Sequence, residues 1–118
     1  MSQEPSPQFL SKAEHALYSL IKAHLPSESE LWLFGSRARG THAWFSDYDV
    51  LIKNDVSGIA THKQAISTIL DALDESWIPF KLDLISFDSA IELNTNKLLQ
   101  SNFYQQVMET AVPWRVHG

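Results

Sequence analysis

Two aspartates separated by one residue, Asp47 and Asp49, are the clearest candidates for chemistry in this sequence. They open an apolar run of strand type, and because strand side chains alternate between two faces, both carboxylates should point the same way. At ~4 Å and an effective dielectric constant of about 20, two such charges repel each other by about 4 kcal/mol. A divalent cation removes that cost, and oxygen-only ligands select a hard ion such as Mg²⁺ or Mn²⁺. The alternative is a pair of polar residues at a strand edge.

A Gly-Ser pair directly after an earlier apolar run, residues 31–34, supplies a second feature. Gly35 lets the backbone approach a ligand closely. Ser36 offers a hydroxyl and an N–H group at a predicted helix start, where exposed amides suit a phosphate; an N-cap role is its alternative. Arg37 and Arg39 add positive charge, and each either binds phosphate or pairs with a surface carboxylate. A phosphate-binding turn beside a carboxylate pair predicts phosphoryl or nucleotidyl transfer.

The motif of residues 35–40, Gly-Ser-Arg-Ala-Arg-Gly, followed by Ser-Asp-Tyr-Asp at residues 46–49, resembles a known signature. It is similar to that of the DNA polymerase beta-like nucleotidyltransferase superfamily and, within it, of the minimal nucleotidyltransferases (MNT), the small partners of HEPN-domain proteins. The family pattern continues with a third carboxylate on a later strand. Asp83, which lies between two leucines, is the candidate, and an exposed strand aspartate is its alternative. The resemblance spans residues 31–86.

The resemblance implies a two-metal mechanism. Asp47 and Asp49 would hold both ions, and Asp83 would ligate one of them and act as general base toward an acceptor hydroxyl. Three crowded carboxylates also predict that at least one has a raised pKa when metal is absent. The residues expected to bind the nucleotide are the four of the turn: Gly35, Ser36, Arg37 and Arg39.

The implied activity is transfer of a nucleoside monophosphate, AMP from ATP, to a hydroxyl group. In this interpretation the chain is the antitoxin of a HEPN/MNT toxin–antitoxin pair and modifies a tyrosine of its HEPN partner. Two alternatives remain: a non-catalytic nucleotide-binding or docking subunit that neutralises a partner, and a catalytic subunit that modifies a small molecule. The three carboxylates disfavour docking alone, because docking needs none of them. A short HEPN reading frame beside the gene would favour the paired system.

Composition limits the other possibilities. The chain has 118 residues, 44% hydrophobic and 19% charged, so we expect a flexible arm at residues 1–10 and one globular domain at residues 11–118. A formal net charge of −5 argues against long nucleic acids as ligands, since these require clustered Lys and Arg. Cysteines are absent, and no apolar run approaches the ~20 residues that span a membrane. These features favour a cytoplasmic protein without a membrane partner.

Two long helices are predicted to support the site. Apolar residues at helical spacing predict helices over residues 11–25, opened by a capping box at Ser11 and stopped by Pro26, and over residues 59–73. Three strands are predicted at residues 31–34, 47–53 and 80–85, and a short helix at residues 36–40. A helical turn is predicted at residues 88–92, a final helix at residues 102–110 and an extended segment at residues 112–116. Pro113 disfavours a central strand in the last of these. The order predicts an α/β (α+β) fold, a small mixed β-sheet with helices packed mainly on one face. The resemblance implies the polymerase beta-like nucleotidyltransferase fold.

Overall fold

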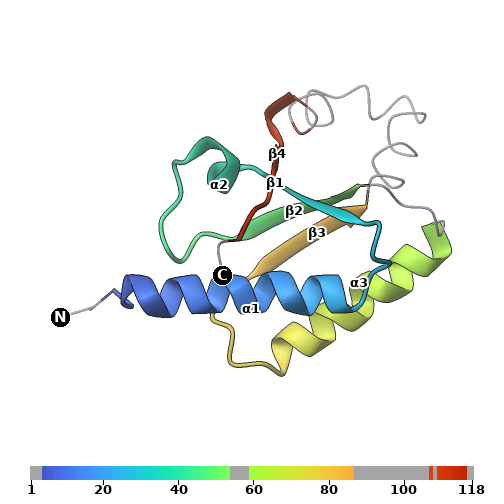
Figure 1. Cartoon of the computed structure of the whole chain (residues 1–118), viewed down its shortest axis with the longest axis horizontal. Coiled ribbons are helices and arrows are strands. Elements are labelled where there is room, and N and C mark those ends of the chain that lie inside the picture. The colour runs from blue at the N-terminus through green and yellow to red at the C-terminus, as the bar shows by residue number, and fades with distance from the viewer. Residues whose placement is uncertain (1–3, 54–58, 87–106, 108, 117–118) are drawn as a thin grey trace.

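A computed structural model describes residues 4–53, 59–86, 107 and 109–116 of the chain (Figure 1). Its helices and strands follow in the order α1 (Pro7–Ala23), β1 (Glu30–Phe34), α2 (Ser36–Arg39), β2 (Tyr48–Lys53), α3 (Ile59–Asp74), β3 (Leu82–Ser86) and β4 (Val112–Pro113). No helix within these ranges combines the length and the apolar character needed to cross a bilayer.

In the described part of the chain, the sheet has four strands in the order β3-β2-β1-β4. β2 is parallel to β3 and antiparallel to β1, and β1 is antiparallel to β4. α3 lies between the parallel strands β2 and β3 in the chain. Parallel neighbours need a crossover connection of a dozen or more residues, and this helix supplies it. α1 and α3 lie on the same side of the sheet (Figure 1). The predicted fold class, a small mixed α/β sheet with helices mainly on one face, is confirmed.

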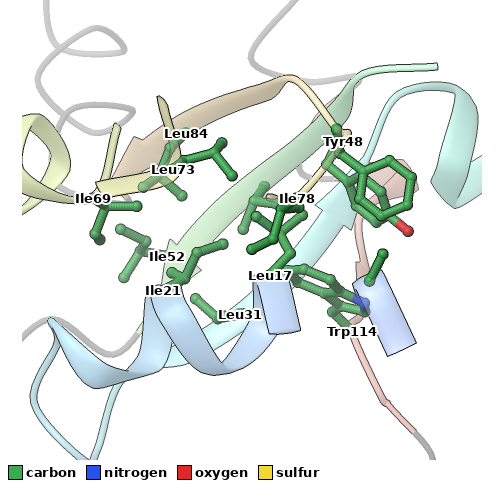
Figure 2. Close-up of a cluster of buried hydrophobic side chains, with 13 residues drawn as sticks. Leu17, Ile21, Leu31, Tyr48, Ile52, Ile69, Leu73, Ile78, Leu84 and Trp114 are labelled. Atoms are coloured by element: carbon green, nitrogen blue, oxygen red, sulfur yellow. The ribbon is translucent and has the colours of Figure 1, made fainter. Parts of the chain in front are cut away.

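The sheet face toward α1 and α3 carries the main hydrophobic core (Figure 2). Val50 and Ile52 of β2 are fully buried there, against Leu17 and Ile21 of α1 and Ile69 of α3. Alternate strand positions and every third or fourth helix position return to the same face, which explains the pattern. Burying one such side chain stabilises the fold by roughly 1.5–3 kcal/mol. This packing holds β2 in the middle of the sheet.

The opposite sheet face carries a smaller apolar cluster. Leu51 and Val107 are buried in it, and Ile85 packs against it. Strand alternation places Asp49 and Asp83 on this same face, two residues before Leu51 and Ile85 respectively. The carboxylates therefore lie on the face that α1 and α3 do not cover.

The start of α1 corrects the predicted helix boundary and the predicted arm. The helix begins at Pro7, and the hydroxyl of Ser6 caps it by accepting a hydrogen bond of 3.1 Å from the amide of Phe9. Proline at the first helical position has the right φ and lacks an N–H that would be left unpaired, so Ser6-Pro7 is itself a helix start. The capping box predicted at Ser11 is therefore wrong, and residues 7–10 are helical.

Other boundaries shift by one or two residues. β2 begins at Tyr48 and not at residue 47, and β3 begins at Leu82 and not at residue 80. Among the described residues β4 is an edge strand, paired with β1, and an edge strand is where a sheet accepts a proline. The helical turn predicted at residues 88–92 lies outside the described residues. Of the final helix predicted at residues 102–110, the described residues 107, 109 and 110 are helical.

Candidate active site

Gly35 brings the turn after β1 into direct contact with the carboxylate strand. Its backbone has φ 72° and ψ −150°, a conformation that only glycine adopts readily. A Cβ atom at this position would overlap the Asp49 carboxylate oxygen Oδ2 and lie 3.2 Å from its Cγ. Glycine is required twice here, by its own conformation and by the neighbour. The group that lies against Gly35 is thus the Asp49 carboxylate, and the approach of a ligand to the Gly35 backbone stays a prediction.

The turn continues into α2, a single helical turn. The amide of Arg39 donates to the carbonyl of Gly35 (3.2 Å), and that of Thr41 donates to the carbonyl of Ser36 (3.1 Å). Gly40 ends the turn with φ 74° in the left-handed region. Gly35 is the N-cap residue and no side chain caps α2, so the alternative role of Ser36 as N-cap is wrong. A helix this short has a small dipole, so anion binding here would depend on individual N–H groups and the Ser36 hydroxyl.

The sheet brings together the predicted catalytic carboxylates. Asp49 on β2 is the register partner of Asp83 on β3, and on its other side it is paired with Phe34, the residue before Gly35. Asp49 is half-buried, whereas Asp83 is exposed. Asp47 is also exposed and lies just before β2. Two of the three predicted ligands are therefore adjacent through backbone pairing, and the third is on the loop that enters β2.

The charges of the site act on one another. Burial, followed by the negative charges of Asp83 and Asp47, raises the pKa of the Asp49 carboxyl above its usual value. Arg39 and then Arg37 oppose this rise. The prediction that one of the crowded carboxyls has a raised pKa in the absence of metal is confirmed for Asp49. The charges of the two other aspartates and of both arginines therefore all act on the Asp49 carboxyl.

The predicted metal ligands are of a suitable chemical type, but their side chains are not arranged around a common metal position. Among the described residues, no group of three or more acidic, histidine or cysteine side chains is arranged to hold a metal ion. The donor set itself fits a hard divalent cation, because Asp47, Asp49 and Asp83 supply oxygen atoms alone. A bound cation would offset the repulsion that raises the pKa of Asp49. The residues therefore suit Mg²⁺ or Mn²⁺ in kind.

Arg37 makes contacts that the sequence did not predict. Its Nη2 donates to the carbonyls of Trp44 and Ser46, both at 2.9 Å, and its Nε donates to the same Ser46 carbonyl at 3.3 Å. The guanidinium carbon lies 3.7 Å from the centre of the Tyr48 ring. Two of its three nitrogens and one face are thus engaged inside the protein. Pairing with a surface carboxylate, one predicted alternative, is not among these contacts.

On the face of β2 that packs against α1, Tyr48, Glu14 and Trp114 form a polar cluster that the sequence did not predict. The hydroxyl of Tyr48 is hydrogen bonded to Glu14 of α1, and Trp114 Nε1 donates to Glu14 Oε2 at 3.1 Å. Burial, followed by the charge of Glu14, raises the pKa of Tyr48. The available signal was the position of Glu14, directly after buried Ala13 and three residues before buried Leu17, at the margin of the apolar stripe.

A pocket of about 440 Å³ lies on this helix-covered side of the sheet. It is lined by residues of α1, of the loop before β2 and of the strands: Pro7, Leu10, Ser11, Glu14, Arg37, His42, Trp44, Tyr48 and Phe80. Because Tyr48 and Asp49 point to opposite faces of β2, the pocket does not contain the carboxylate pair. The pocket and the carboxylate pair therefore lie on opposite faces of the sheet.

Comparison with known proteins decides the family. A sequence profile described as the nucleotidyltransferase domain matches residues 17–100, which include the glycine-serine turn and all three aspartates. The chain belongs to this nucleotidyltransferase family. No curated protein sequence matches it.

Several solved structures resemble this nucleotidyltransferase, and three of them illustrate the likeness. A toxin–antitoxin structure with AMP-PNP aligns with TM-score 0.50 and 22% identity over 86% of this chain and 72% of that chain. A protein assigned to the minimal nucleotidyltransferases aligns with TM-score 0.48 and 20% identity over 96% of this chain and 100% of that chain. A protein from Sulfolobus solfataricus assigned to the nucleotidyltransferases aligns with TM-score 0.43 and 17% identity over 78% and 84%. The first of these supports the fold assignment.

Proposed function

We propose that this nucleotidyltransferase transfers AMP from ATP to a hydroxyl group. The observation that carries the proposal is the contact between Gly35 and Asp49, which sets the phosphate-binding turn directly against the carboxylate pair. A site for nucleotidyl transfer needs both parts within the length of a triphosphate. The family assignment and the charges of the site support the same chemistry.

Each residue has a role in this proposal. Asp47, Asp49 and Asp83 would hold Mg²⁺ or Mn²⁺, which when bound neutralises phosphate charge and lowers the pKa of the acceptor hydroxyl. The Gly35 backbone permits close approach of the outer phosphates, and the Ser36 hydroxyl and N–H bind them. Their binding orients the α-phosphate toward the acceptor.

The bond changes follow from this arrangement. The acceptor oxygen attacks the α-phosphorus, the bond between the α-phosphorus and the bridging oxygen breaks, and pyrophosphate leaves with that electron pair. Asp83, exposed on β3 beside Asp49, takes the proton of the hydroxyl. Arg39, exposed at the end of α2, adds positive charge toward the departing pyrophosphate.

We further propose that the acceptor belongs to a partner protein. The described part of the chain is one compact sheet with its helices and no separate substrate domain. The similar toxin–antitoxin structure, solved with AMP-PNP, supports a paired system with a nucleotide. The sequence resemblance to minimal nucleotidyltransferases supports a HEPN-domain toxin as this partner, with a tyrosine hydroxyl as acceptor. In this pair the present chain is the antitoxin.

Label transfer tests the proposal. The chain is expressed with its neighbouring gene product and supplied with Mg²⁺ and α-labelled ATP, alongside an Asp47→Asn, Asp49→Asn double variant. Asp71→Asn, at an exposed position of α3, is the matched control. We expect label on the partner with the wild type and the control, and none with the double variant. A complex that forms and neutralises the partner without label, in the double variant as in the wild type, would establish docking in place of catalysis.

A further inference from the structure

The loop that leads into β2 is closed by its own hydrogen bonds. The amide of Ala43 donates to Ser46 Oγ at 2.9 Å, and the amide of Ser46 donates to the carbonyl of Ala43 at 3.1 Å. These two bonds give residues 43–46 a fixed shape. They do not by themselves attach that shape to the rest of the molecule.

Arg37 provides the attachment. From α2 its side chain reaches seven residues ahead to the Trp44 carbonyl and nine ahead to the Ser46 carbonyl, with hydrogen bonds of 2.9 Å to each from Nη2. Its Nε makes the third bond, to Ser46. A planar guanidinium can address two carbonyls at once in this way, and a lysine ammonium lacks that rigid fork.

The second anchor of Arg37 is the aromatic side chain that follows Asp47. The guanidinium stacks on the ring of Tyr48, 3.7 Å from its centre, and lies 5.4 Å from the ring centre of Phe80. Tyr48 is only 2% exposed, and its amide donates to the Lys81 carbonyl at 2.9 Å. Arg37 therefore holds the residue before Asp47 by its carbonyl and rests on the residue after it.

Asp47 lies in the loop segment that Arg37 holds. Its side chain is exposed, and it lies one residue outside the β2 ladder. Its location depends on the backbone of Ser46 and Tyr48, the two residues that Arg37 contacts. The half-buried Arg37 guanidinium thus donates its hydrogen bonds to backbone carbonyls of the loop that carries Asp47.

We infer that Arg37 is a positioning residue that fixes the place of Asp47, and that it is not a ligand of the triphosphate. This inference rests on the proposed nucleotidyl transfer for its kinetic consequence, but its structural part does not. It also separates the two arginines of the turn: Arg37 orders the loop, and exposed Arg39 is the one available to phosphate.

Arg37→Lys tests the inference, with Arg39→Lys as the matched control. Hydrogen exchange of the backbone amides of residues 43–48 is measured without nucleotide or metal, so this readout requires no activity. We expect exchange in this segment to rise at least about tenfold in Arg37→Lys and to stay unchanged in Arg39→Lys. Unchanged exchange in Arg37→Lys would overturn the inference, whatever the activity of the protein.

Kinetics supply the second readout. Misplacing a catalytic group by about 1 Å costs on the order of 10²-fold, so kcat should fall by about that factor in Arg37→Lys, with less than about a threefold change in KM for ATP. Arg39→Lys should instead raise KM. A raised KM with unchanged kcat in Arg37→Lys would make Arg37 a phosphate ligand and refute the inference. A wild type that transfers no label refutes the proposed function, and the exchange result still decides the role of Arg37.

A second variant covers the case in which Arg37→Lys does not fold. Ser46→Ala removes the bond from the Ala43 amide to Ser46 Oγ and leaves Arg37 in place. We expect a smaller rise in exchange over the same segment and a smaller fall in kcat, with KM for ATP unchanged. Wild-type exchange and kcat in this variant would count against a loop whose order positions Asp47.

Discussion

The two faces of β2 differ in kind although they belong to one short strand. On one face Tyr48, Val50 and Ile52 are almost completely buried against α1 and α3. On the other face Asp49 is half-buried beside exposed Asp83, and its pKa is raised by burial and by like charges. One face lowers the free energy of the fold, and the other tolerates an electrostatic cost. The difference indicates that the candidate chemistry is supported by the core beneath it, and substitutions on each face should separate activity from stability.

The largest effect is expected from Asp49→Asn on activity. The change removes a charge from the polar face with little change in size, so we expect transfer of labelled AMP to fall by about 10³-fold. The stability of the fold should not decrease. The measurement is the initial rate of label transfer together with a thermal unfolding curve. An active Asp49→Asn variant would remove the polar face from the mechanism.

Ile52→Ala, three residues along the same strand, should have the complementary effect. Ile52 is fully buried in the main core, so the lost packing and the cavity should cost about 2–5 kcal/mol of unfolding free energy. Denaturant unfolding measures this cost. Leu70→Ala, at a 39% exposed position of α3, is the control and should cost much less. The folded fraction of Ile52→Ala should keep a kcat near that of the wild type; a selective loss of kcat would show that the two faces are coupled.

Two glycines sharpen the comparison at the edge of the polar face. In Gly35→Ala, the alanine must take a backbone conformation that is restricted to glycine, and its Cβ atom must displace the Asp49 carboxylate. We therefore expect the unfolding free energy to fall by roughly 1–3 kcal/mol and activity to be lost. Gly40→Ala has a left-handed φ of 74° but no atom within 4 Å of its Cβ, and should cost about 1 kcal/mol with activity kept. Unfolding curves and label transfer distinguish the two. Equal effects would contradict a specific contact between Gly35 and Asp49.

The smallest effect concerns pH. Because the folded-state pKa of Asp49 is raised, the folded protein binds a proton more readily than the unfolded chain, and the stability associated with that proton is lost as pH rises through the folded pKa. Asp49→Asn should therefore raise the melting temperature by a few degrees at neutral pH. The gain should shrink on acidification and vanish below about pH 4, the usual carboxyl range. Melting curves across this range in the absence of metal, with Asp71→Asn alongside, give the test. A gain that persists at low pH would assign the effect to packing.

The sequence predicted the three longer strands because apolar runs are local features, and strand alternation alone sets Asp83 opposite its two leucine neighbours. Leu82 and Leu84 flank Asp83, and burial of alternate residues leaves little choice of face. Such predictions need only the neighbouring residues and the assumption of a core. The pairing of Asp49 with Asp83 comes from the structure, because it depends on the register between β2 and β3.

What the sequence could not predict depends on contacts between distant residues. From the sequence, Arg37 was expected either to bind phosphate or to pair with a surface carboxylate, and nothing local shows that its side chain donates to carbonyls seven and nine residues ahead. Glu14 meets Trp114 across a separation of 100 residues. The start of α1 was missed for a different reason: two start signals competed, and the one at Ser6 was the stronger.

The pairing of β2 with β3 has a consequence for how the site is lost. Asp49 and Asp83 are register partners only because Val50 and Leu84, one residue further along, are buried as partners on the other face. A strand period of two means that a slip of one residue would turn Asp83 inward and Leu84 outward. The carboxylate pair therefore shares the cooperativity of the core. On heating or in denaturant it should disappear in a single step with global unfolding, with no intermediate in which the sheet persists and the pair has come apart.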